Sequence, residues 1–144
     1  MSLPLPKTEA TMLGFLSSFE DGTLPKERWS HGAHLLAGAW YVHALGEDAA
    51  LDHMRICVKR YNEAVGGRNT ATSGYHETVT AFWIKMLAAF LSSNQPIARA
   101  DFARLAVAHF EPQRDLYRRY YSYDVIANTE ARATWRAPDL QPIA

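Results

Sequence analysis

Apolar side chains recur every three or four positions along most of the chain, separated by clusters of glycine, proline and polar residues. This spacing is typical of amphipathic α-helices, and no alternation at every second position is long enough to predict a strand. The pattern predicts helices over about residues 9–20, 31–45, 47–65, 75–92 and 100–110, with short helices around 113–120 and 129–136. The predicted fold is therefore an all-α single domain spanning residues 1–144, a helical bundle of four or five main helices with short C-terminal accessory helices.

Capping and loop signals divide these helices. Ser30 is a suitable N-cap for the second helix, since its side chain can accept from the free amides of the first turn. The glycine-rich, polar stretch 66–74 separates the third helix from the fourth and is too polar for an ordered element. We expect this stretch to be a loop that covers a pocket, with Arg68–Ser73 as a lid.

Composition narrows the class of protein. Of the 144 residues, 48% are hydrophobic and 21% are charged, and the formal net charge is +0 from 15 basic and 15 acidic residues. With no basic stripe, we expect no nucleic-acid partner, and the apolar runs are too short for a membrane span. The N-terminus lacks the pattern of a signal peptide, and the single Cys57 excludes an internal disulfide. A cytoplasmic, bacterial-type protein that acts on a small-molecule ligand is the expectation.

Histidines occur at the predicted starts of two helices, on faces that are otherwise apolar. His31 and His34 share an arc of the second helix with Leu35, Gly38, Val42 and Leu45, and His76 shares a face of the fourth with Val79, Thr80, Trp83, Leu87 and Phe90. Short connections favour antiparallel neighbours, so the second and fourth helices should run in the same direction. Their first turns would then meet, with Glu77 beside His76. On the antiparallel third helix, Asn62 would reach the same end and Arg55 would lie two turns deeper.

This arrangement permits a divalent metal site. His31, His34 and His76 would be the ligands of zinc or iron, which leaves a coordination position for water or substrate. Glu77 would be a fourth ligand or the general base, and Arg55, Asn62 and Thr80 would contact the substrate or orient the ligands. The leading hypothesis is accordingly a metal-dependent enzyme that carries out hydrolysis or proton transfer on a small molecule.

Two other interpretations stay open. In one, no metal binds, and the histidines with Arg55 and Asn62 form a site for an anionic organic ligand, which helix N-termini also favour. In the other, the histidines are hydrogen-bonded core residues of a structural or interaction domain, because one histidine on an apolar face is more often a satisfied core residue than a ligand.

Three segments also resemble a family of small uncharacterised bacterial all-helical proteins. The matching residues are Trp29-Ser30-His31-Gly32-Ala33-His34-Leu35, Arg60-Tyr61-Asn62-Glu63-Ala64 and Gly74-Tyr75-His76-Glu77-Thr78-Val79-Thr80. The C-terminal segments Tyr120-Tyr121-Ser122 and Trp135–Leu140 are similar to the end of that family. The resemblance implies no reaction. A more distant similarity is to DinB-type helical bundles, which hold a metal through three histidines at a different spacing.

Overall fold

The computed structural model describes residues 4–143, and within that range the chain folds into helices and loops without a strand. The α-helices are α1 (Glu9–Asp21), α2 (His31–Leu45), α3 (Glu47–Ala64), α4 (Glu77–Ser92), α5 (Arg99–Phe110) and α6 (Thr129–Ala133). Short 3-10 turns lie at Lys26–Arg28, Glu111–Gln113 and Leu116–Arg119. The predicted all-α architecture with five main helices is confirmed.

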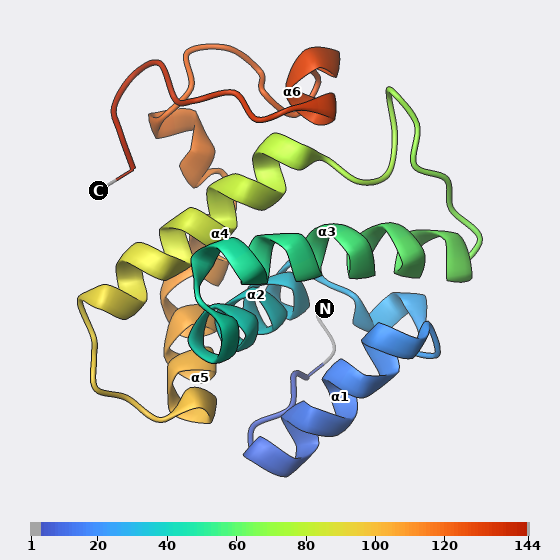
Figure 1. Ribbon diagram of the computed structural model, residues 1–144, viewed down its shortest axis with the longest axis vertical. Coiled ribbons are helices and arrows are strands. Elements are labelled where there is room, and N and C mark those ends of the chain that lie inside the picture. The colour runs from blue at the N-terminus through green and yellow to red at the C-terminus, as the bar shows by residue number, and fades with distance from the viewer. Residues whose placement is uncertain (1–3, 144) are drawn as a thin grey trace.

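Helix α2 lies at the centre of the molecule. It packs against α3, α4 and α5, and its middle is buried on every side, including Leu36, Ala39 and Trp40. The sequence pattern predicts a single buried arc for α2, and this prediction is wrong, because the middle of a helix surrounded by three others has no solvent-facing side. Leu45, expected inside, is half exposed at the C-terminal end. Figure 1 shows α2 enclosed by the other helices.

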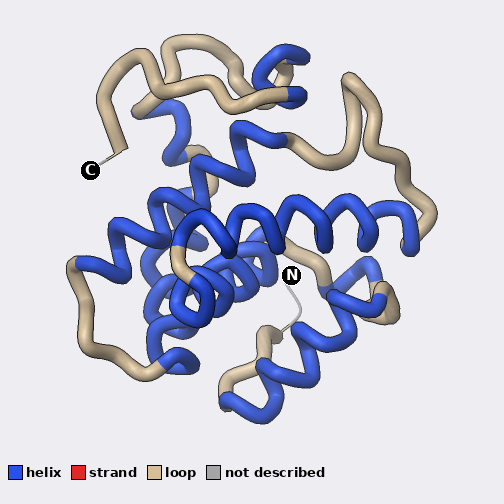
Figure 2. The backbone as a smooth tube through the Cα atoms, viewed as in Figure 1, coloured by secondary structure: helices blue, strands red, loops and turns tan. Residues whose placement is uncertain are grey.

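Helices α2 and α4 run in the same direction, as predicted, while α3 runs opposite to α4. The ring of His31 lies beside Trp83, and a Cβ at Gly38 would lie 2.8 Å from Leu87 Cδ1. The earlier residue of α2 thus contacts the earlier residue of α4, and the later residue contacts the later one, as in parallel helices. Glu47 and Arg55 of α3 pair with Lys85 and Glu77 respectively, which gives the opposite order. Figure 2 shows the long loop that joins the end of α3 to the start of α4.

The C-terminal segment covers the first turns of α4. The hydroxyl of Thr78 donates to Thr134 O over 2.8 Å and accepts from Arg136 N over 2.9 Å. Helix α6 also packs against α4, and the chain beyond it returns to the turn at residue 120, where Leu140 N donates to Tyr120 O. This cover fixes the start of α4. Within the described residues, no helix combines the length and apolarity that a bilayer span requires.

Candidate ligand pocket beside His31 and His34

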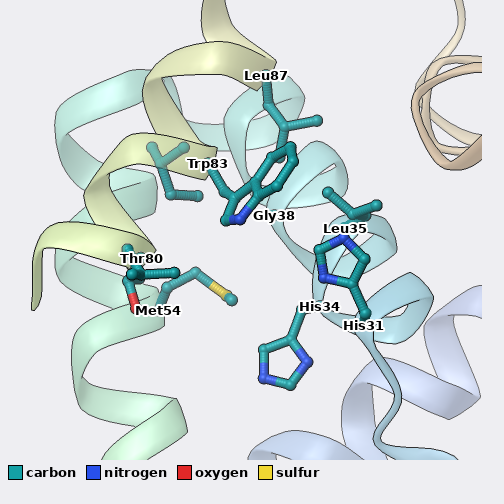
Figure 3. Close-up of a pocket in the computed structure, with 10 residues that line it drawn as sticks. His31, His34, Leu35, Gly38, Met54, Thr80, Trp83 and Leu87 are labelled. Atoms are coloured by element: carbon teal, nitrogen blue, oxygen red, sulfur yellow. The ribbon is translucent and has the colours of Figure 1, made fainter. Parts of the chain in front are cut away.

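A cavity of about 320 Å³ lies between α2, α3 and α4, and we refer to it as the inner chamber. Its apolar wall is formed by Leu35, Met54, Val79, Trp83, Ile84 and Leu87. Its polar side chains are His31, His34 and Thr80, and Gly38 completes the lining. Figure 3 shows the two imidazoles on the α2 side, with Thr80, Trp83 and Leu87 reaching toward the cavity from α4. The size and mostly apolar lining are those of a small-molecule pocket.

The imidazole of His31 is held without a protein hydrogen bond at Nε2. The ring packs against Trp83, with ring centroids 5.2 Å apart, and Nε2 is buried with no partner among residues 4–143. Burial, reinforced by His34 and Arg114, lowers the pKa of His31 from 6.5 to about 4. At neutral pH the ring is therefore uncharged. A buried polar nitrogen without a partner costs about 1–3 kcal/mol, which makes this position unusual for a purely structural histidine.

His34 is oriented by its neighbours. Its Nδ1–H donates to Ser30 O over 2.8 Å, and the indole of Trp29 packs against the ring with centroids 4.1 Å apart. Burial lowers the pKa of His34, so the ring is neutral at pH 7. With the proton on Nδ1, Nε2 carries a lone pair that can accept a hydrogen bond from a ligand.

A second cavity of about 580 Å³, the outer chamber, adjoins the inner chamber along His34, Val79 and Thr80, which line both. Trp29, Val58 and Val65 form part of its apolar wall, and Lys26, Asn62, Arg68 and Ser73 are among its polar lining residues. The segment between α3 and α4 contributes residues 67, 68, 73 and 74, together with Val65, Tyr75 and His76. The loop expected to act as a lid therefore lines the outer chamber.

His76 serves as the N-cap of α4. Its Nδ1 accepts from Val79 N over 3.2 Å, and its Nε2–H donates to Val125 O over 2.9 Å. Burial lowers the pKa of His76, in keeping with a neutral ring that accepts at one nitrogen and donates at the other. Both nitrogens are occupied by the backbone, so neither is available to a metal in this conformation.

The helix register explains why His76 stands apart from His31. Trp83, seven positions after His76, is the α4 residue level with His31. At 1.5 Å per residue, seven positions separate His76 from that level by about 10 Å along the helix axis. The parallel direction of α2 and α4 was predicted correctly, but their first turns are not level.

Glu77 and Arg55, predicted as a base and a substrate contact, bind each other. The Arg55 guanidinium donates to both oxygens of Glu77, over 2.9 and 2.7 Å, and Tyr75 OH donates to Glu77 Oε1 over 2.8 Å. The hydrogen bond from Arg55 is the main cause that lowers the pKa of Glu77. A carboxylate stabilised in this way is a weak proton acceptor, and Glu77 lines neither chamber.

Asn62 lines the outer chamber and also anchors its loop. Its Nδ2 donates to Asn69 Oδ1 over 3.0 Å, and the same oxygen accepts from Tyr75 N over 3.0 Å. Gly74 closes the loop at a φ of 79°, where a Cβ would lie 2.5 Å from Arg68 O, so only glycine fits. Thr80, the remaining predicted contact residue, lines both chambers.

The described residues contain no group of three or more His, Cys, Asp or Glu side chains arranged to hold a metal ion. The predicted triad divides into two neutral histidines beside the inner chamber and one helix cap. Trp29, Met54 and Lys26 line the chambers but were not predicted as pocket residues. Arg68 and Ser73, the first and last residues of the predicted lid, both line the outer chamber.

In comparisons with known proteins, the chain matches no family model, no curated protein sequence and no solved structure.

Proposed function

We propose that this protein binds a small organic molecule in the inner chamber, through the neutral imidazoles of His31 and His34 and without a metal ion. The observation that carries this proposal is the buried, unpartnered Nε2 of His31 beside a cavity of about 320 Å³. An organic ligand with one hydrogen-bonding group would satisfy that nitrogen once a small rotation of the His31 ring turns Nε2 toward the chamber, while the apolar part of the ligand fills the chamber.

His34 narrows the chemistry of the ligand. Because Nδ1–H is committed to Ser30 O, Nε2 can only accept, so the ligand must present a donor such as a hydroxyl or an N–H. The apolar wall from Met54, Trp83 and Leu87 favours an aromatic or branched hydrocarbon group next to that donor.

The test uses p-cresol and toluene, two probes of the same shape that differ by one hydroxyl. NMR titration of ¹⁵N-labelled protein should show p-cresol shifting the ring nitrogens of His31 and His34 and the indole of Trp83. Toluene should bind at least tenfold more weakly, because it leaves the imidazoles unpaired. In His31→Leu this preference should shrink. If p-cresol, indole and 1-octanol all leave the chamber resonances unchanged at millimolar concentration, the proposal is wrong.

A further inference from the structure

We propose that the natural ligand is an amphipathic organic monoanion that spans both chambers, with its apolar, hydroxyl-bearing end beside His31 and His34 and its anionic group beside Lys26 and Arg68. This inference rests on the proposed function and adds the charge, length and orientation of the ligand.

The two chambers share a boundary, so one molecule can occupy both. His34 and Thr80 line each of them, from α2 and α4 respectively. A ligand whose donor contacts His34 from the inner side therefore needs only a short chain to pass this boundary. The inner chamber is about twice the size of a ~150 Å³ cavity that accepts benzene, so it holds a substituted ring.

The lining of the outer chamber carries positive charge, whereas the described lining of the inner chamber carries none. No described Asp or Glu lines either chamber, whereas Lys26 and Arg68 both line the outer one. Within the described part of the chain, neither cation forms an ion pair, in contrast to Arg55, Arg104 and Arg136. Two unpaired cations over an uncharged cavity attract an anionic group and repel a cationic one.

A second buried nitrogen without a partner supports occupancy of the outer chamber. Trp29 lines this chamber, and its Nε1 is buried without a hydrogen bond. Trp29 Nε1 and His31 Nε2 are the two such side-chain atoms among the described residues, and they belong to residues of the outer and inner chambers respectively. An N–H donor on a residue of the chamber that Lys26 and Arg68 also line is suited to a carboxylate or another oxyanion.

The test compares three ligands that share a phenol and differ in charge at the other end. These are 3-(4-hydroxyphenyl)propionate, its neutral amide, and the cation tyramine, each titrated by calorimetry and by ¹⁵N NMR. The propionate should bind at least tenfold more tightly than the amide, and tyramine should bind most weakly. Added salt should reduce the preference for the propionate, because the outer chamber is solvent-accessible.

The variant K26A/R68A should bring the propionate and the amide within about twofold of each other while p-cresol binding is unchanged. The charge-matched control is R118A/R119A, which removes two exposed cations that line neither chamber and should retain the tenfold preference. If p-cresol binds but the propionate, the amide and tyramine bind equally, or tyramine binds best, this inference is overturned and the proposed function stands. If neither p-cresol nor the propionate binds, both are overturned.

Discussion

His31 meets Trp83 edge-on, at a ring-centroid distance of 5.2 Å and an interplanar angle of 65°. Because α2 and α4 run in parallel, this contact sets the register between them. It places the start of α2 level with the second and third turns of α4 and leaves His76 beyond the inner chamber. His31 and His76, which occupy similar predicted positions at helix starts, therefore lie in different surroundings. Substitutions at the two positions should affect stability differently.

We expect His31→Leu to stabilise the protein and His76→Leu to destabilise it. Replacing the unpartnered His31 nitrogen with an apolar group should raise the free energy of unfolding by about 1 kcal/mol. Removing His76 takes away the cap of α4 and the partner of Val125 O, which should cost about 2–4 kcal/mol. Urea denaturation followed by circular dichroism measures both. Equal destabilisation in the two variants would contradict the assigned roles.

The depressed pKa of His31 makes stability depend on pH in a defined window. Its folded pKa is about 4 against 6.5 in the unfolded chain, so between these values only the unfolded state binds the proton. The stabilisation is fully present above pH 6.5 and is lost as pH falls toward 4, by on the order of 2 kcal/mol. The pKa values of His34 and His76 are lowered in the same sense.

The pH dependence can be assigned to His31 by substitution. The urea concentration at the unfolding midpoint of the wild-type protein should decrease as the pH is lowered from 7 to 4. The midpoint of His31→Leu should decrease less over the same pH range. A variant with an unchanged slope would show that His31 does not titrate as described.

The sequence was sufficient for the helices because their signals are local. The N-cap Ser30 and the start of α2 at His31 agree with prediction, since the Ser30 hydroxyl accepts from Ala33 N. The start of α4 was predicted two residues early, at 75, because the cap is a histidine ring and not a serine or aspartate side chain. Histidine is not among the usual N-cap residues, so the pattern gave no reason to expect it.

The site was predicted only in part because its geometry depends on register and on distant segments. The pairing of His31 with His34 follows from their spacing within α2, and Thr80 follows from the face of α4. The partner of His76, Val125, is 49 positions away and carries no side-chain signal, because a backbone carbonyl accepts the bond. The pairing of Arg55 with Glu77 likewise depends on how far α3 slides along α4. Single-sequence periodicity does not contain that distance.

We expect the two carboxylate partners of Arg55 to contribute unequally to the free energy of unfolding. Glu77 is 13% exposed and accepts two hydrogen bonds from Arg55, whereas Asp52 is 71% exposed. Glu77→Gln should cost about 2 kcal/mol, because it leaves a half-buried guanidinium without its main counter-ion. Asp52→Asn should cost less than about 0.5 kcal/mol. Thermal or urea denaturation distinguishes them, and comparable losses would argue against the assigned Arg55–Glu77 pair.

Metal analysis tests the hypothesis that His31, His34 and His76 together bind a metal ion. Because both nitrogens of His76 are held by the backbone, protein purified without a histidine tag should contain well under one equivalent of zinc or iron by elemental analysis. Zinc added to the purified protein should bind weakly, and His76→Asn, which can keep a side-chain cap, should not change that binding. One tightly bound equivalent that disappears in His76→Asn would restore the three-histidine site.

Asn69 should control the order of the loop over the outer chamber. Its side chain accepts from Asn62 Nδ2 and Tyr75 N and donates to Lys59 O over 3.0 Å, so it ties the loop to the end of α3. Asn69→Ala removes these hydrogen bonds and should speed hydrogen exchange of the Tyr75 amide at least tenfold, because opening the loop then costs less free energy.

The control is Ser73→Ala, since the Ser73 hydroxyl bonds only within the loop, to Thr70 and Arg68 O. It should leave exchange at Tyr75 within about twofold of wild type. If the loop orders Arg68, the cation that it contributes to the outer chamber, Asn69→Ala should also weaken 3-(4-hydroxyphenyl)propionate more than p-cresol, which occupies the inner chamber alone. Equal weakening of both ligands would show that the loop supports the inner chamber, and no change in exchange would show that Asn69 is not the anchor.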